Sequence, residues 1–280
     1  MQIKNRSCAN NSPTLQVNVN GTIFTYREFG KEEGIPIILL HHFTAVIDDW
    51  DPKMIDGLAK EKWVITFDNR GVGGSGGKTP TTVQDMANDA LLFIESLGLK
   101  KVDLLGFSLG GFISQVIVEK KPELVRRVIL AGTGVAGRNG NDKVLTMTSD
   151  FLRGGLTLRH PKYYLFFTHT KIGKKAAGEF LNRIKERKVD RVKSSSIRTA
   201  LAQSQAIYRW TTQKPMDLSK IIHPVLVVNG EDDRMISTES SYELARRLPN
   251  SSLIIYPDAG HGSIFQYHSD FVKKAIQFLS

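Results

Sequence analysis

The strongest signal in the sequence is the stretch Val102-Asp103-Leu104-Leu105-Gly106-Phe107-Ser108-Leu109-Gly110-Gly111-Phe112. It places Gly-x-Ser-x-Gly between an apolar run of strand length and a segment of helical composition. A serine at such a turn needs a strained backbone and very small neighbours two residues away on each side, which Gly106 and Gly110 provide. The start of the following helix directs backbone N–H groups toward the same point. The pattern predicts that Ser108 is a nucleophile, and a structural serine in a turn is the alternative.

Strands and helices alternate on both sides of this stretch. The expected strands cover residues 23–29, 35–40, 63–67, 102–106, 128–130, 225–228 and 252–256. The expected helices cover residues 52–60, 81–97, 112–119, 238–248 and 269–279. Residues 35–40 are continuously apolar, as in a strand buried on both faces, whereas residues 23–29 alternate as in a strand with one wet face. This order predicts an α/β fold with a mostly parallel sheet covered by helices on both faces.

The alternation stops between residues 135 and 218. This segment is basic and helical in composition, and it contains no convincing buried strand. We expect it to be a helical insertion between two strands, standing over one edge of the sheet. The chain shows no internal repeat and no low-complexity tract.

Composition excludes several classes of protein. With 280 residues, 41% hydrophobic and 24% charged, the chain is unlike disordered, collagenous or coiled-coil sequences. It has no apolar run near the roughly 18 residues that a membrane span requires. Residues 1–14 are polar and lack the apolar core of a signal peptide. Cys8, the only cysteine, excludes an internal disulfide and lies in this polar tail, so we expect a cytoplasmic protein in which Cys8 is not catalytic.

The positive charge is unevenly distributed. The net charge is +10, and residues 134–220 hold about 18 basic and 6 acidic side chains, so the rest is nearly neutral. A solvated basic surface is the plain interpretation. The basic residues are scattered and match no recognition motif, so we expect no nucleic-acid partner. If these cations face the mouth of the active site, anionic esters should bind better than neutral ones at low salt.

A serine hydroxyl needs a base to remove its proton. His261 is the best of the seven histidines, because Gly260 and Gly262 flank it in a short loop after the last expected strand. We interpret His160, His169 and His223 as surface residues, and His268 as lying near the start of the final helix.

A carboxylate should orient that imidazole. The strand at 225–228 ends in Asn229-Gly230-Glu231-Asp232-Asp233-Arg234, where only one acid of a tight turn can readily face the histidine. We favour Asp233, with Asp232 as the alternative and Glu231 less suitable. Arg234 and the remaining acids should be solvated or form local ion pairs. The order Ser108, Asp233, His261 along the chain is typical of one fold in particular.

The developing oxyanion of an acyl-transfer reaction needs two donors. We expect the backbone N–H of Leu109 and that of Phe43, in the loop His41-His42-Phe43-Thr44. No further ligand is spaced to make a metal site with His41 and His42, so we interpret both as packing residues. The glycine-rich segment 68–75 lacks the lysine of a phosphate-binding loop and is expected to be a structural turn. Aromatic residues are expected to line or pack near a pocket: Trp50, Trp210, Tyr163, Tyr164, Phe166 and Phe167.

These motifs together resemble the α/β-hydrolase superfamily, within it the branch of cofactor-free haloperoxidases (perhydrolases) and small carboxylesterases. The likeness is carried in order by residues 39–43, 68–75, 106–111, 230–233 and 260–261, so it covers nearly the whole chain. It implies an eight-stranded sheet, a helical cap over residues 135–218, and a core domain made of residues 1–134 and 219–280. It further implies a site without metal or cofactor between the two, and it supports Asp233, three residues after Gly230. One departure is His42, because relatives usually have glycine there.

The resemblance and the residues predict a serine hydrolase that cleaves a carboxylic ester or a related acyl bond through an acyl-enzyme. Perhydrolysis, lactone opening, acyl transfer and carbon–carbon bond hydrolysis would use the same residues. Serine at position 108, where relatives that open epoxides or displace halide have aspartate, argues against those two activities. A ligand receptor with slow turnover is the alternative from another class. The expected partner is a small-molecule acyl substrate, and a homodimer is left open.

Overall fold

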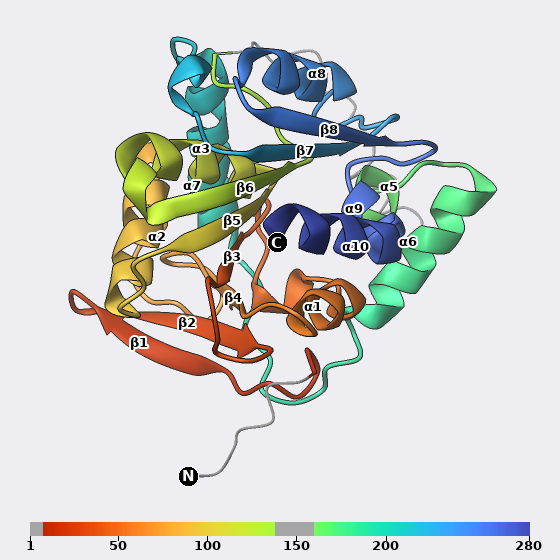
Figure 1. Ribbon diagram of the computed structural model, residues 1–280. Coiled ribbons are helices and arrows are strands. Elements are labelled where there is room, and N and C mark those ends of the chain that lie inside the picture. Colours follow the sequence, from red (N-terminus) through yellow and green to blue (C-terminus); the bar gives the residue numbers. More distant parts are fainter. Residues whose placement is uncertain (1–7, 138–159) are drawn as a thin grey trace.

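A computed structural model describes residues 8–137 and 160–280 (Figure 1). Its centre is an eight-stranded sheet in the order β1-β2-β4-β3-β5-β6-β7-β8. β1 pairs with β2, and β2 with β4, in antiparallel directions, whereas the pairs from β4 through β8 are parallel. The predicted α/β fold with a mostly parallel, eight-stranded sheet is therefore confirmed.

The expected elements have close counterparts in the structure. The strands are β1 (Leu15–Val19), β2 (Thr22–Phe29), β3 (Ile37–Leu40), β4 (Val64–Phe67), β5 (Val102–Phe107), β6 (Val125–Ala131), β7 (Val225–Gly230) and β8 (Ser251–Tyr256). The α-helices are α1 (Pro52–Ala59), α2 (Val83–Ser96), α3 (Leu109–Lys120), α5 (Lys162–Leu165), α6 (Lys171–Arg183), α7 (Ile197–Thr212), α8 (Thr238–Arg247), α9 (Ser263–Gln266) and α10 (His268–Leu279). Short 3-10 helices cover Ile47–Asp49, Pro122–Leu124 and Leu218–Lys220.

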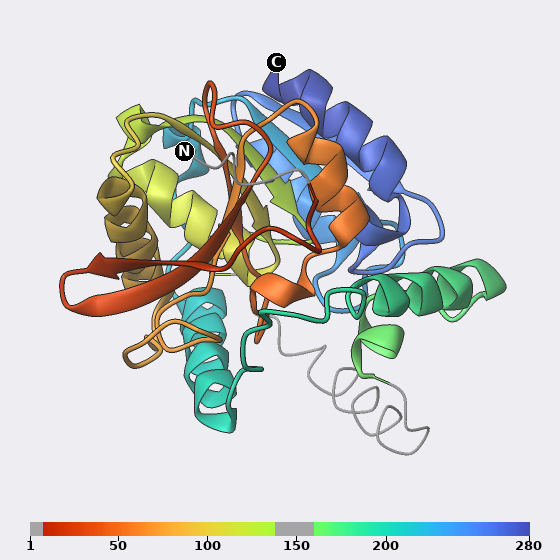
Figure 2. The same cartoon turned by 90° about the horizontal axis from the view of Figure 1, so that it is seen from below.

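Two hydrophobic cores lie on opposite faces of the sheet. Successive side chains of a strand point to opposite faces. In β3, Ile38 and Leu40 accordingly join the core under α2, α3 and α8, whereas Ile37 and Leu39 join the core under α1 and α10. Figure 2 shows the sheet between α1 and α10 on one face and α2 and α3 on the other. This double covering explains why the central strands are continuously apolar.

The N-terminal part differs from expectation in two ways. Leu15–Val19 forms a first strand that is not among the expected ones. Residues before it pack on the protein, and Ser12 is fully buried. The strand at 23–29 has no wet face, because Thr25, Arg27 and Glu28 are all buried. The charged Arg27 can be buried because its guanidinium donates hydrogen bonds to Thr14 and Asp48. The polar pattern thus marks a buried ionic contact and not a solvent-facing side.

The described part of the insertion, residues 135–137 and 160–218, contains helices and no strand, as predicted. Figure 2 shows α6 and α7 at the same end of the molecule. Contacts place this segment at the carboxyl ends of the strands. Gln203 of α7 accepts a hydrogen bond from Thr44 N, after β3, and Phe166 O accepts one from Gly262 N, after β8. Residues 138–159 of the expected cap lie outside the described residues, and the division into core and cap domains stays a prediction.

None of the described helices combines the length and apolar composition needed to cross a membrane.

Candidate active site

Ser108 lies at the turn between β5 and α3. Its φ of 56° and ψ of −115° fall in a region that residues with a side chain rarely adopt. The turn is held on both sides: Ser108 N donates to Ala131 O at 2.9 Å, and Ser108 O accepts from Thr133 Oγ1 at 2.8 Å. The end of β6 and the residues that follow it therefore fix the strained backbone, and the serine lies at the carboxyl end of the sheet.

The two glycines around Ser108 have no room for a side chain. A Cβ at Gly106 would lie 2.3 Å from Ser114 Oγ, and one at Gly110 would lie 2.0 Å from Leu40 O. Gly110 thus packs directly against the end of β3, where the loop with His41, His42 and Phe43 begins. This contact brings the amides expected to bind an oxyanion, those of Phe43 and Leu109, onto adjacent segments.

His261 and Asp233 form a buried pair. His261 Nδ1 lies 2.8 Å from Asp233 Oδ2, and both side chains are at most 1% exposed. The other oxygen of Asp233, Oδ1, accepts the backbone N–H groups of Met235 and Ile236 at 2.8 and 3.0 Å. The turn therefore fixes the carboxylate, and the carboxylate in turn orients the imidazole with its Nε2 free to act as a base.

Of the three consecutive acids, the structure pairs Asp233 with His261, whereas Glu231 and Asp232 are exposed. The loops after β7 and β8 meet at Gly230, where a Cβ would lie 2.1 Å from Ala259 O. Asp232 N also donates to Ala259 O at 2.9 Å. These backbone contacts bring the acid and the histidine together although they are 28 residues apart.

Ser108 and His261 line one cavity of about 240 Å³. The other described lining residues are His42, Phe43, Thr44, His160, Pro161, Lys162, Leu165, Phe166 and Met235. Among the described residues, His261 Nε2 is buried with no hydrogen-bond partner, which leaves it able to accept a proton. The cavity combines this base with apolar walls from the insertion, a lining suited to a small organic molecule.

His41 and His42 are both buried, as expected for packing residues. Burial lowers the pKa of His41 to about 4, and its ring packs near Trp50. Burial, and then the Lys162 ammonium, lower the pKa of His42 well below its usual range. Because His42 Nδ1 lies 2.9 Å from Phe43 O, which can only accept, that nitrogen carries the proton of the neutral ring. The larger side chain is accommodated edge-on between Phe107 and Phe166.

The glycine-rich segment after β4 is a structural turn, as predicted. The buried Asp68 carboxyl accepts backbone N–H groups from Ile47 and Gly74, each at 2.8 Å. Gly73 has a φ of +54°, and a Cβ there would lie 2.2 Å from Asp68 Oδ2. Burial raises the pKa of Asp68 to about 7. The backbone N–H groups of Ile47 and Gly74 thus bind the aspartate of the turn itself and are not available to bind a phosphate.

The surface interpretation of the remaining histidines is only partly right. His160 is exposed, but it also lines the cavity beside Ser108. His169 is half-buried, with its Nε2 3.1 Å from Arg234 Nη2, and Arg234 also donates to Tyr164 O at 2.8 Å. Arg234 therefore links the acid turn to the insertion.

All six aromatic residues singled out from the sequence are buried, but Phe166 is the one that lines the cavity. Trp210 stacks on Phe112 of α3 with ring centroids 5.2 Å apart, which makes it a packing residue. Sequence reasoning missed the cavity residues Pro161, Lys162, Leu165 and Met235. Lys162 is the charged residue of these four, and one lysine among many basic residues carries no distinguishing pattern.

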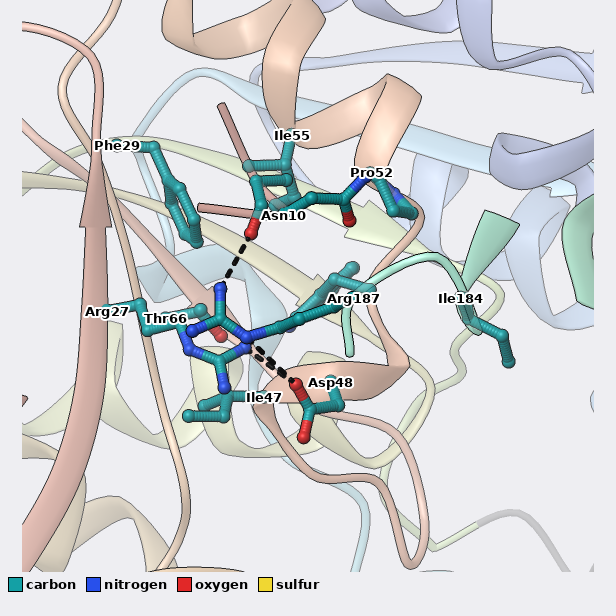
Figure 3. Close-up of a pocket in the computed structure, with 12 residues that line it drawn as sticks. Asn10, Arg27, Phe29, Ile47, Asp48, Pro52, Ile55, Thr66, Ile184 and Arg187 are labelled. Atoms are coloured by element: carbon teal, nitrogen blue, oxygen red, sulfur yellow. Dashed lines mark hydrogen bonds and ion pairs between the residues drawn. The ribbon is translucent and has the colours of Figure 1, made fainter. Parts of the chain in front are cut away.

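A second, much smaller cavity of about 20 Å³ lies away from Ser108 (Figure 3). Its polar wall is made by Arg27, Asp48 and Arg187, with Asn10 above them. Arg187 donates to Ala9 O at 3.1 Å and to Ser12 O at 2.8 Å, while Arg27 pairs with Asp48 at 2.7 Å. This cluster ties the N-terminal segment to the insertion and the core, and we interpret it as structural.

No group of three or more histidine, cysteine, aspartate or glutamate side chains among residues 8–137 and 160–280 is arranged to hold a metal ion.

The strained serine turn, the Asp233–His261 pair and the strand order are features of α/β hydrolases, and comparison with known proteins agrees. Residues 35–266 match the family described as alpha/beta hydrolase fold. The chain belongs to this family.

Among its relatives is a solved alpha/beta hydrolase fold protein from Chitinophaga pinensis, 39% identical, with a TM-score of 0.91 over 98% of this chain and 99% of that one. A non-heme chloroperoxidase of Streptomyces lividans is 25% identical over 88% of this chain and 91% of its own length. The 2-hydroxy-6-oxo-6-(2'-aminophenyl)hexa-2,4-dienoic acid hydrolase of Metapseudomonas resinovorans is 27% identical over 94% of this chain and 90% of its own. The likeness to the haloperoxidase branch expected from the sequence is therefore confirmed.

Proposed function

We propose that this α/β hydrolase is a serine hydrolase that cleaves a carboxylic ester or a related acyl bond. The observation that carries the proposal is the buried Asp233–His261 pair, whose imidazole opens on the same cavity as Ser108. A histidine held by a carboxylate next to a serine on a strained turn is the arrangement that activates a hydroxyl for acyl transfer.

In the proposed reaction, His261 takes the proton of Ser108 Oγ as this oxygen attacks the acyl carbonyl. The backbone N–H groups of Phe43 and Leu109 donate to the oxyanion that develops. His261 then gives its proton to the leaving group, which departs and leaves an acyl-enzyme. A water molecule deprotonated by His261 attacks the acyl group, and the acid is released with Ser108 restored.

The acceptor and the exact acyl bond are the open parts of the proposal. The relative named chloroperoxidase favours a second candidate, in which hydrogen peroxide replaces water and the acyl-enzyme gives a peracid. The relative named for a dienoic acid favours substrates that carry a carboxylate. Both candidates use the same serine, so they differ in acceptor and substrate and not in the first step.

The test replaces Ser108 by alanine. We expect Ser108→Ala to lower kcat on p-nitrophenyl butyrate by about three or more orders of magnitude, because no hydroxyl remains to form the acyl-enzyme. A fluorophosphonate probe should add its mass to the wild-type protein at Ser108 and leave the variant unlabelled. Asp233→Asn should lower turnover strongly. The matched control Asp232→Asn should retain it.

Two outcomes would contradict the proposal. Turnover retained by Ser108→Ala would eliminate the serine as nucleophile. Fast labelling of the wild type with negligible turnover over a series of ester chain lengths would favour a ligand receptor. Peracid formation in the presence of hydrogen peroxide, compared with acid formation in its absence, separates the two candidate acceptors.

A further inference from the structure

The described lining of the cavity beside Ser108 includes a charged side chain, Lys162. Among its described lining residues, Lys162 is the only lysine, arginine, aspartate or glutamate. The pKa of the buried His42 is lowered chiefly by burial, and that of the otherwise exposed His160 by partial desolvation where the ring borders the cavity, so both rings are neutral at neutral pH. The charge that a substrate meets in this part of the cavity is therefore that of the Lys162 ammonium.

The counter-ion of Lys162 lies behind it. The ammonium bonds to Oδ1 of Asp49, whose side chain does not line the cavity and whose Oδ2 accepts Val46 N at 2.9 Å. Although burial favours the neutral acid, Lys162 keeps the pKa of Asp49 well below its usual range. The ion pair is thus intact at neutral pH, with its positive end toward the cavity.

An ammonium has three N–H donors, and Asp49 uses one of them. The Lys162 side chain is 11% exposed, and its Nζ lies 5.9 Å from the centre of the Phe166 ring, which also lines the cavity. The cation is therefore shielded from bulk water yet borders the space where a substrate would lie. An anionic oxygen reaching it would form a charge-assisted hydrogen bond with little screening by salt.

The other buried cations in the described part of the insertion bind groups outside this cavity. Arg183 pairs with Asp51 at 2.5 Å, and Arg187 donates to the carbonyl groups of Ala9 and Ser12. Neither arginine lines the cavity beside Ser108. The excess of positive charge in residues 134–220 thus reaches the described part of this cavity through one residue.

We propose that Lys162 binds a carboxylate of the substrate. The enzyme should therefore prefer acyl compounds whose acyl chain carries an anionic carboxylate in addition to the acyl bond that is cleaved. This inference rests on the proposed function, since it names the substrate class of the same site. Lys162 acts as a specificity-determining residue and takes no part in the proton transfers between Ser108 and His261.

The test uses two esters with acyl chains of equal carbon number. One is p-nitrophenyl butyrate, which is neutral, and the other is the mono-p-nitrophenyl ester of succinic acid, which ends in a carboxylate. Lys162→Met removes the ammonium and keeps an apolar stem. We expect this variant to lower the ratio of kcat/KM for the anionic ester over the neutral one by about tenfold, as loss of one charge-assisted hydrogen bond would. The loss should fall mainly on KM.

Three further variants control the experiment. Lys174→Met removes an exposed lysine of α6 and should leave the ratio unchanged. Lys162→Arg keeps the cation and should retain most of the preference. Lys162→Met leaves the Asp49 carboxylate buried without its partner. The double variant Lys162→Met/Asp49→Asn removes both charges, and it should show the same loss of preference for the anionic ester.

Failure of this inference can be told apart from failure of the proposed function. An unchanged ratio in both Lys162→Met and the double variant would overturn the carboxylate site while Ser108-dependent turnover persists. If Ser108→Ala hydrolyses the esters as well as the wild type, the proposed mechanism fails instead. A binding measurement tests Lys162 without turnover. Monomethyl succinate should raise the melting temperature of Ser108→Ala, and this rise should disappear in the double variant Ser108→Ala/Lys162→Met. A rise that persists in the double variant would refute the site.

Discussion

Gly110 shows how the absence of one side chain can set the distance between two loops of the candidate active site. Its Cα approaches the end of β3 so closely that an added Cβ would lie 2.0 Å from Leu40 O and 2.4 Å from Leu40 C. Both are backbone atoms, which cannot move aside as the end of a flexible side chain can. The distance between the serine turn and the Phe43 loop therefore depends on glycine at this position.

We predict that Gly110→Ala destabilises the protein by about 2–3 kcal/mol or more and slows labelling of Ser108 by a fluorophosphonate, because the turn must move away from the loop. Urea unfolding and labelling rates measure the two effects. Gly178→Ala is the matched control: it lies within α6 with no atom inside 4 Å of the added Cβ, so it should stabilise by about 0.5–1 kcal/mol. Equal stability of the two variants would show that the close approach to Leu40 is not tight.

Residue patterns from local sterics were predictable from the sequence. The glycines around Ser108 and the loop carrying His261 follow from what a tight turn requires, and the structure brings Ser108 and His261 to one cavity. Pairs such as Lys162 with Asp49, 113 residues apart, were not predictable. They depend on how the insertion folds back over the core, and a scattered excess of basic residues does not say which cation meets which carboxylate.

At the scale of elements, the N-terminal segment is fastened by the insertion. Thr14 N donates to Asp190 Oδ2 at 2.7 Å and its hydroxyl to Asp190 O at 3.0 Å, while Arg187 binds the carbonyl groups of Ala9 and Ser12. In the sequence these residues resemble a polar tail, because a segment whose hydrogen-bond partners are distant in the chain has no periodicity of its own. The polar backbone and side-chain groups of the N-terminal segment are the groups that the insertion binds.

We predict that Arg187→Met loosens this segment and costs about 2 kcal/mol, since buried carbonyl groups lose a charged donor. Hydrogen–deuterium exchange should rise in a peptide covering residues 8–14, and urea unfolding should report the loss of stability. Lys188→Met, at the neighbouring exposed position, is the control and should change neither quantity. Unchanged exchange in Arg187→Met would mean that the other contacts of the N-terminal segment, such as those of Thr14 with Asp190, hold it in place without Arg187.

For the molecule as a whole, buried titratable groups couple folding to pH. His41 lies at the end of β3 with its Nε2 3.2 Å from Thr66 Oγ1, and burial lowers its pKa to about 4, against 6.5 for an exposed histidine. Between these values the unfolded chain binds a proton that the folded protein excludes. The contribution of His41 to stability is therefore fully present above about pH 6.5 and is lost as the pH falls toward 4.

Asp68 works in the opposite direction, because burial raises its pKa to about 7 and its contribution to stability is lost as the pH rises from about 4 to 7. Comparing the wild type with His41→Gln cancels the Asp68 contribution, which both proteins share. Glutamine keeps a polar partner for Thr66 but cannot titrate. The free energy of unfolding, measured in urea from pH 4.5 to 7.5, should fall less steeply on acidification in the variant, by about 1 kcal/mol per pH unit near pH 5.5. Parallel curves for the two proteins would show that His41 is protonated equally in the folded and unfolded states.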